Sequence, residues 1–160
     1  MTDHINNKSV QKVYNALLSF GLNPQIIEFP ESTRTAQDAA NAIGCEVAHI
    51  VKSLIFCTQE TNQPVLVLTS GINRVNEKMI EQLVGEKIKK ADADFAREVT
   101  GFAIGGVPPV AHVQQITTII DCDLLQYETL WAAAGTPNTV FSLQSSDLVN
   151  ITQGRVAKVC

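Results

Sequence analysis

The sequence predicts an α+β domain with a mixed, curved sheet of about seven short strands, drawn into a pseudobarrel, with flanking helices. Helical and strand-like segments alternate irregularly, without the regular strand-helix repeat of a doubly wound parallel sheet. The chain has 160 residues, of which 45% are apolar, so one hydrophobic core can form without metal or disulfide support. We therefore expect a single domain over residues 1–160.

Five segments carry the signals of helices. Residues 8–20 place apolar side chains on one helical face, and Gly21 follows as a candidate C-terminal cap. Thr35 is a candidate N-cap with Asp38 three residues later, which predicts a second helix over residues 36–43 that stops at Gly44. Further helices are expected at residues 73–84, 93–99 and 146–150, the last capped by Ser145 or Ser146.

The remaining regular segments are rich in β-branched and aliphatic residues, which predicts strands. Residues 50–57 and 64–69 are separated by five polar residues and are expected to form a hairpin. The other expected strands are residues 25–29, 117–121, 130–134, 139–143 and 155–159. Residues 101–112 hold two adjacent glycines and two adjacent prolines, so we expect them to be irregular.

Composition excludes several classes of function. With 12 Lys and Arg against 16 Asp and Glu, the net charge is −4, so any nucleic-acid contact must be local. The four cysteines form no C-x-x-C pair, and no histidine stands at metal-ligand spacing. No apolar run approaches the length of a membrane helix. The sequence thus predicts a cytoplasmic protein with free thiols, no membrane segment, no metal and no cofactor.

Lys52 is the first unusual residue. If residues 50–56 are extended, Lys52 shares one face of its strand with Ile50, Leu54 and Phe56. One interpretation is a lysine whose stem lies along the core while its ammonium reaches water. The other is a cation that points into a pocket and holds a carbonyl, carboxylate or phosphate.

The loop around Gly105 and Gly106 is the second candidate. Two glycines let main-chain N–H groups approach a ligand, while Pro108 and Pro109 make the loop stiff. A tight crossover in which the glycines only avoid clashes would explain the same residues. The spacing matches neither a dinucleotide fingerprint nor a phosphate-binding P-loop.

A third candidate is the run of small residues at 132–138, which ends a strand at a turn with Gly135 and Pro137. An ordinary turn explains it almost as well. His112 lacks a neighbouring carboxylate and is not expected to act as a general base. Cys122 lies between two aspartates, which would raise its pKa and make it a poor nucleophile.

Together these segments resemble the YbaK/EbsC family, which includes the ProX-type deacylases and the editing insertion of bacterial prolyl-tRNA synthetases. Residues 50–56, 105–109 and 133–137 occur in the order and at the spacing of that family. Its lysine matches Lys52, and its G-x-x-x-P loop matches residues 105–109. The resemblance extends over nearly the whole chain, including the helix start at Thr35.

The resemblance implies an aminoacyl-tRNA deacylase that removes a wrong small amino acid, with tRNA(Pro) as the expected carrier. The implied partners are the acceptor end of the charged tRNA and prolyl-tRNA synthetase. Lys52 and the main-chain N–H groups of Gly105 and Gly106 would act in catalysis. The implied substrate-binding residues are Val107, Pro108, Pro109, Ala133, Gly135 and Thr136.

Several alternatives stay open at this point. Ala133 stands where relatives often have a serine, so the amino acid removed is not decided. The family includes both hydrolysis and attack by a thiol of the substrate. The rival function is a non-catalytic module of the same fold that binds a small ligand or a synthetase partner.

Overall fold

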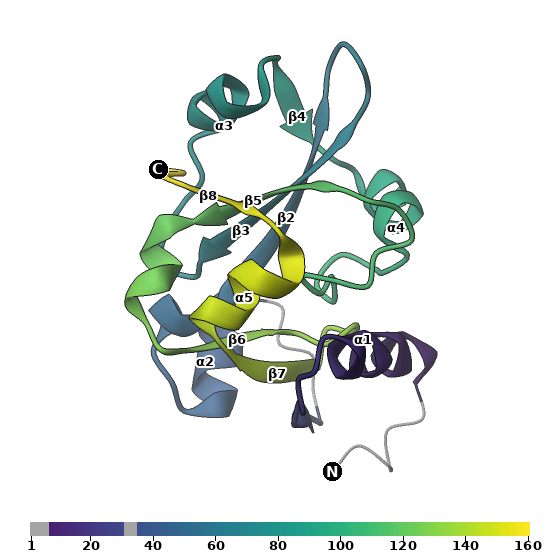
Figure 1. The fold of residues 1–160 in the computed structure, drawn as a ribbon, viewed down its shortest axis with the longest axis vertical. Coiled ribbons are helices and arrows are strands. Elements are labelled where there is room, and N and C mark those ends of the chain that lie inside the picture. Colours follow the sequence, from purple (N-terminus) through teal and green to yellow (C-terminus); the bar gives the residue numbers. More distant parts are fainter. Residues whose placement is uncertain (1–6, 31–34) are drawn as a thin grey trace.

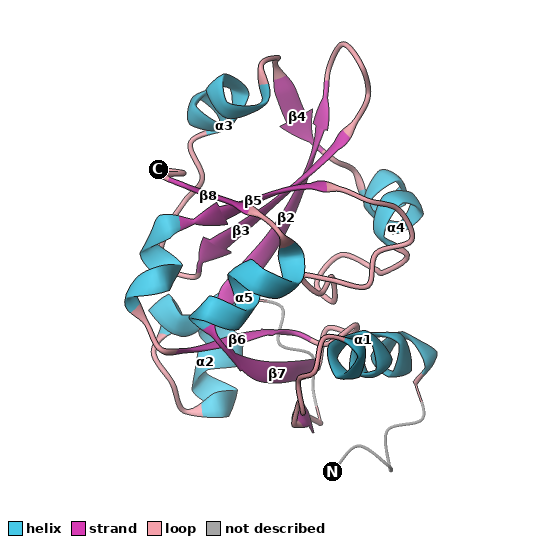
Figure 2. Ribbon diagram, viewed as in Figure 1, coloured by secondary structure: helices cyan, strands magenta, loops and turns pink. Residues whose placement is uncertain are grey.

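Two β-sheets organise the fold (Figures 1 and 2). The computed structural model describes residues 7–30 and 35–160. In these residues one sheet has five strands in the order β4-β2-β3-β5-β8, and the other has three in the order β1-β7-β6. The α+β class is therefore confirmed. The expected pseudobarrel of about seven strands is not, because eight strands form two sheets and the described residues close no barrel.

The five-stranded sheet is mixed. The predicted hairpin is confirmed, since β2 (Val51–Thr58) and β3 (Pro64–Ser70) pair antiparallel with Lys52 opposite Thr69. The short β4 (Ile88–Lys90) adds antiparallel to β2 and was not predicted. On the other side, β5 (Thr117–Asp121) lies parallel to β3, and β8 (Arg155–Ala157) lies parallel to β5.

The three-stranded sheet is antiparallel. Its central strand β7 (Thr139–Gln144) pairs with β1 (Ile26–Glu28) on one side and β6 (Thr129–Ala133) on the other. An isolated parallel bridge between Ile50 and Trp131 connects this sheet to the start of β2.

The helices are α1 (Lys8–Ser19), α2 (Ala36–Ile43), α3 (Glu77–Val84), α4 (Ala93–Thr100) and α5 (Ser145–Thr152). The predicted cap of α2 is confirmed, because Thr35 Oγ1 accepts a hydrogen bond from the Asp38 N–H at 3.0 Å. Helix α3 begins later than expected, because Asn76 caps it. The expected serine cap of α5 is wrong, since Gln144 occupies the N-cap position and Ser145 is already helical.

The two faces of β2 enter different cores, as the alternation predicts. Val51 and Ile55 pack into the larger core, which α1, α5 and the three-stranded sheet share. Leu54 and Phe56 pack into a smaller core under α3. Lys52 follows the second set, so its side chain starts from the α3 side of the sheet. On α1 the prediction of a single apolar face fails at Leu18, whose side chain is 43% exposed.

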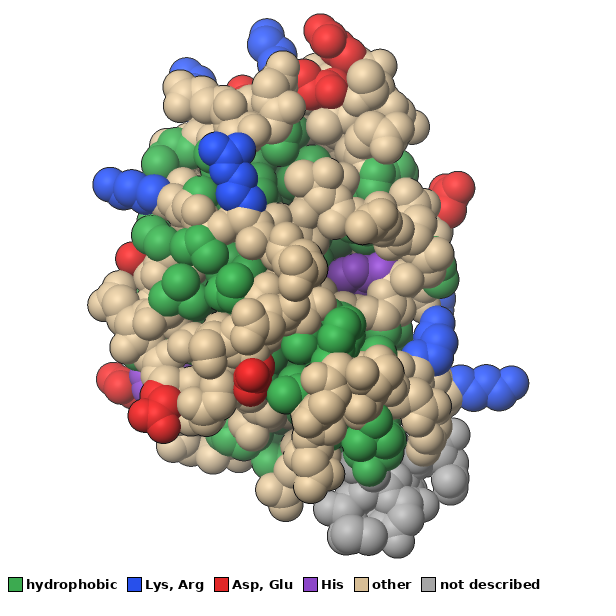
Figure 3. All heavy atoms as spheres, in the orientation of Figure 1, with side chains coloured by type: hydrophobic (Ala, Val, Ile, Leu, Met, Phe, Trp, Pro, Cys, Tyr) green, Lys and Arg blue, Asp and Glu red, His purple; other side chains and the backbone are tan. Residues whose placement is uncertain are grey.

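The surface carries scattered charge. On the face drawn in Figure 3, blue and red side chains are spread over the surface, and several of both colours lie near the top of the view. Within the described ranges, no helix combines the length and the apolar character needed to cross a membrane.

Candidate functional site

A cavity of about 570 Å3 lies where β2, the loop over residues 101–112, α2 and the three-stranded sheet meet. All three sequence-predicted features contribute to its lining. They are represented by Lys52, Gly105, Val107, Ala133 and Pro137. Residues more than 80 positions apart in the chain are thus brought to one hollow.

The glycine loop and the small-residue turn pack directly on each other. A Cβ on Gly106 would lie 2.7 Å from Thr136 Cα, closer than real Cβ contacts come, so only glycine fits there. A Cβ on Gly105 would meet only Pro137, at 3.7 Å. Gly106 therefore permits the close approach of the two segments, and Gly105 faces the cavity.

The two predicted N–H donors have different environments. The Gly106 N–H donates to the Ala103 carbonyl at 3.0 Å and closes a turn. Gly105 is the third residue of this turn and has a φ of +95°, a conformation that favours glycine. Its own N–H donates no hydrogen bond to any residue that the structure describes. Of the two groups, the N–H of Gly105 is the one available to a ligand.

The prolines and His112 support the loop from behind. Pro108 and Pro109 are buried and lie outside the cavity lining. The His112 Nε2 donates to the Pro108 carbonyl at 2.8 Å. Burial lowers the pKa of His112, and the hydrogen bond to Pro108 partly opposes that shift. The neutral imidazole thus braces the loop.

The turn that follows β6 is closed by its own side chains. The Thr136 hydroxyl lies 2.7 Å from the Thr139 hydroxyl and donates to Asn138 Oδ1 at 3.0 Å. A Cβ on Gly135 would lie 2.8 Å from the Ser9 carbonyl oxygen, so this glycine permits α1 to approach. Gly135 and Thr136 do not line the cavity; Ala133 and Pro137 do.

Lys52 is half-buried, and its ammonium already has one partner. The Lys52 Nζ donates to the Asn73 carbonyl at 2.7 Å, which leaves further N–H groups for a ligand. Burial lowers the pKa of Lys52. The nearby Asp121 carboxylate opposes this shift, and the Arg74 guanidinium adds to it. The side chain is therefore held in place while part of its donor capacity stays open.

Asp121 holds the loop that receives Lys52. This carboxylate is 1% exposed and stands at the end of β5. Its Oδ2 accepts from the Thr69 hydroxyl at 2.9 Å, the Ser70 N–H at 3.0 Å and the Asn73 side-chain amide at 2.8 Å. Sequence reasoning passed over this residue. The available signal was an acidic residue at the end of an otherwise uncharged strand.

The same acid belongs to a group that could offer metal ligands. Ligand atoms of Asp121, Cys122 and Asp123 lie within 4.8 Å of one another. Both oxygens of Asp121 already accept hydrogen bonds, the second from the Asp123 N–H at 2.9 Å. Protein donors alone therefore account for the arrangement of this cluster.

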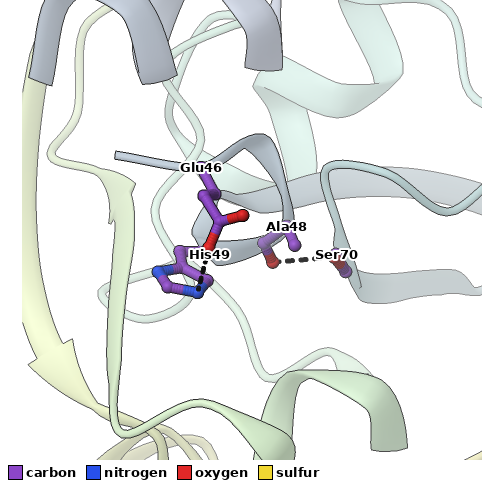
Figure 4. A network of polar contacts seen from close by, with 4 residues as sticks. All are labelled: Glu46, Ala48, His49 and Ser70. Atoms are coloured by element: carbon purple, nitrogen blue, oxygen red, sulfur yellow. Dashed lines mark hydrogen bonds and ion pairs between the residues drawn. The ribbon is translucent and has the colours of Figure 1, made fainter. Parts of the chain in front are cut away.

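Further parts of the lining come from the start of α2 and from the 3-10 helix Val47–His49, neither of which was predicted to line a site. Figure 4 shows how this segment is held: the Ser70 hydroxyl donates to the Ala48 carbonyl at 2.7 Å. His49 and Glu46 form a longer pair at 3.8 Å. A Cβ on Gly71 would overlap the Val47 carbonyl oxygen, so the close contact requires glycine.

Comparison with known proteins decides the family. The model of the aminoacyl-tRNA editing domain matches residues 30–151. The chain belongs to this family. The editing domain is also 27% identical to the uncharacterized protein YwhH of Bacillus subtilis (strain 168) over 148 residues, 92% of this chain and 94% of that protein. It is 32% identical to a proline–tRNA ligase of Thermodesulfovibrio yellowstonii over 79 residues, 49% of this chain and 14% of the ligase.

Solved structures agree with this assignment. A protein described as a proposed trans-editing enzyme for prolyl-tRNA synthetase is 42% identical, with a TM-score of 0.90 over 96% of this chain and 97% of its own. The hypothetical protein APE2540 is 30% identical, with a TM-score of 0.86 over 92% of this chain and 98% of its own. The resemblance inferred from Lys52 and the glycine loop is confirmed.

Proposed function

We propose that this editing domain hydrolyses the ester that joins a wrongly attached small amino acid to the terminal adenosine of a tRNA, with tRNA(Pro) as the carrier. One observation carries the proposal: Lys52 and Gly105 line the same cavity, and the N–H of Gly105 donates no hydrogen bond to a described residue. A volume of about 570 Å3 is in the range that holds a small organic ligand. The family and its prolyl-tRNA relatives support the choice of substrate.

The chemistry needs no side-chain nucleophile. The N–H of Gly105 would donate to the ester carbonyl oxygen as negative charge develops there. The Lys52 ammonium would hold the carbonyl or the terminal phosphate. A water oxygen adds to the carbonyl carbon, the bond to the ribose oxygen breaks, and a proton passes to that oxygen. Free amino acid and uncharged tRNA result.

The expected partners are the acceptor end of the charged tRNA and prolyl-tRNA synthetase. The chain carries a net charge of −4, so it would hold the acceptor end locally while prolyl-tRNA synthetase holds the tRNA body. An activity on charged tRNA belongs to the cytoplasm, where translation takes place.

The test is a deacylation panel with tRNA(Pro) charged with alanine, cysteine or serine. Lys52→Ala is expected to slow release at least about a hundredfold, because one lost electrostatic contact to the transition state costs about 3 kcal/mol. Lys89→Ala is the matched control, since Lys89 is an exposed lysine of β4 that lines neither the main cavity nor the one beside it.

Two results would contradict the proposal. Wild-type protein that leaves every ester intact would remove the catalytic role. Ligand-induced thermal stabilisation that depends on Lys52, without any deacylation, would instead establish the non-catalytic binding module.

A further inference from the structure

A second cavity, of about 310 Å3, adjoins the first. The two cavities share five lining residues: Lys52, Ser53, Leu54, Ile104 and Val107. Lys52 is the one charged residue among these shared lining residues, so it can contact a ligand that extends from one cavity into the other.

Three cations line the second cavity: Lys52, Arg74 and Lys90. Lys90 pairs directly with Phe56 across β4 and β2. Since Phe56 and Lys52 share one face of β2, both lysines start from the same side of the sheet. Arg74 approaches from the loop after β3, next to the Asn73 carbonyl that receives Lys52. A net-acidic chain thus gathers positive charge at one hollow.

Two of these cations have no partner in the part of the chain that the structure describes. Neither the Arg74 guanidinium nor the Lys90 ammonium has a hydrogen-bond or ion-pair partner there, and both residues are exposed. Glu77 is the one acidic residue in the described lining, and it is paired with neither cation. The positive charge of Arg74 also lowers the pKa of Lys52, so these two cations repel each other when no anion lies between them.

We propose that the second cavity binds the phosphodiester group immediately 5′ to the aminoacylated adenosine, with Arg74 and Lys90 as its cationic ligands. This inference rests on the proposed deacylase function. An ester on the terminal ribose places the reacting carbonyl at one end of the nucleotide and its 5′ phosphate at the other. With the carbonyl beside Gly105 in the first cavity, the chain leaves past Lys52 into the second.

The binding test uses the trinucleotide cytidylyl-cytidylyl-adenosine as the probe, with adenosine for comparison. Arg74→Ala and Lys90→Ala are each expected to raise the Kd of the trinucleotide about fivefold. Each is also expected to reduce the slope of log K against log salt concentration by about 0.7, as one lost phosphate contact on a single strand does. Adenosine binding should not change.

Lys89→Ala is the matched control. Lys89 has the same charge and lies next to Lys90, but it pairs with Cys57 and therefore belongs to the opposite face of β4. Its removal should leave both the Kd and the salt slope at wild-type values. The proposal is overturned if Arg74→Ala and Lys90→Ala behave like this control. It is also overturned if inorganic phosphate binds with the same dependence on Arg74 and Lys90 while the trinucleotide gains nothing over adenosine.

Kinetics separate this inference from the deacylase function itself. On charged tRNA, Arg74→Ala and Lys90→Ala should raise KM about fivefold, while release from a 3′-aminoacyl-adenosine without phosphates should proceed at the wild-type rate. If wild type cleaves no ester yet binds the trinucleotide with this charge dependence, the deacylase function fails and the phosphate site stands. If wild type cleaves esters and both variants match it on tRNA, the phosphate site fails and the deacylase stands.

Discussion

Two walls of the main cavity are held in different ways. The wall with Lys52 depends on polar contacts that converge on Asp121, a single buried carboxylate. The wall with Gly105 depends on close packing, in which Gly106 lies against Thr136 and the loop prolines are buried. In such a polar network, the loss of one shared acceptor leaves several buried donors unpaired, so a single substitution can strongly lower stability. In a packed loop, stability depends on several separate contacts, so the loss of one contact has a smaller effect.

The largest expected effect is that of Asp121→Ala. It would remove the acceptor of the Thr69 hydroxyl and the Ser70 N–H and one of the two acceptors of the Asn73 amide, so we expect a loss of about 3 kcal/mol or more in the free energy of unfolding. Urea denaturation measures it. Asp123→Ala is the control, because among the described residues that half-buried side chain accepts only from Asn73 and Gln126. Equal losses in the two variants would contradict a network centred on Asp121.

The packed wall is tested by Gly106→Ala. The new Cβ would lie 2.7 to 2.8 Å from the Thr136 main chain, and relief of such a clash costs about 1 to 3 kcal/mol. Gly21→Ala is the comparison, since Gly21 has a φ of +85° but open space around its Cβ. Thermal unfolding should show the larger loss for Gly106→Ala. A smaller loss than that of Gly21→Ala would mean that the two segments separate easily.

A smaller, pH-dependent effect is expected at His112. Burial keeps its pKa below the usual 6.5, so the unfolded chain takes up a proton that the folded one resists. The stability that neutral His112 contributes is therefore fully present above about pH 6.5, and it is lost as the pH falls through the lowered pKa of the folded state. His112→Gln keeps a donor for the Pro108 carbonyl and should flatten this dependence between about pH 7 and pH 5. Urea midpoints that fall equally in both proteins would refute this role.

The smallest expected effect is that of Ser53→Ala, in the β2 strand that lines both cavities. Among the described residues, the Ser53 hydroxyl is the buried side-chain group without a hydrogen-bond partner. Its removal should leave stability unchanged within about 0.5 kcal/mol or raise it slightly. A loss above about 1 kcal/mol in chemical denaturation would show that the hydroxyl has a partner after all.

Much of the fold could be predicted because its signals are local. The cap of Thr35 on α2, the hairpin of β2 with β3 and the bounds of β5 all follow from neighbouring residues. Strand β4 could not be predicted, because three residues carry no period and its two lysines resemble a loop. The division into two sheets also depends on pairing between distant segments, which no local pattern contains.

Part of the candidate site could also be predicted from local sequence signals, and part could not. Lys52 is conspicuous because a charge interrupts an apolar strand, and Gly105 because glycines and prolines interrupt an apolar loop. Asp121 and Arg74 occupy ordinary positions in the sequence and matter only through what the fold brings near them. The N–H groups of Gly105 and Gly106 look equivalent in the sequence, and only the turn at Ala103 distinguishes them.

The bridge between Ile50 and Trp131 has a consequence for the width of the main cavity. Among the described residues, this isolated β-bridge is the backbone pairing that joins the two sheets, and Ile50 lies two positions before Lys52. Ile50 and Trp131 also form part of the cavity lining. A slight rotation of the smaller sheet about this bridge would widen or narrow the main cavity. Under the proposed deacylase function, we therefore expect the size limit on accepted amino acids to depend on how firmly this bridge is held, as well as on the residues that the amino acid contacts.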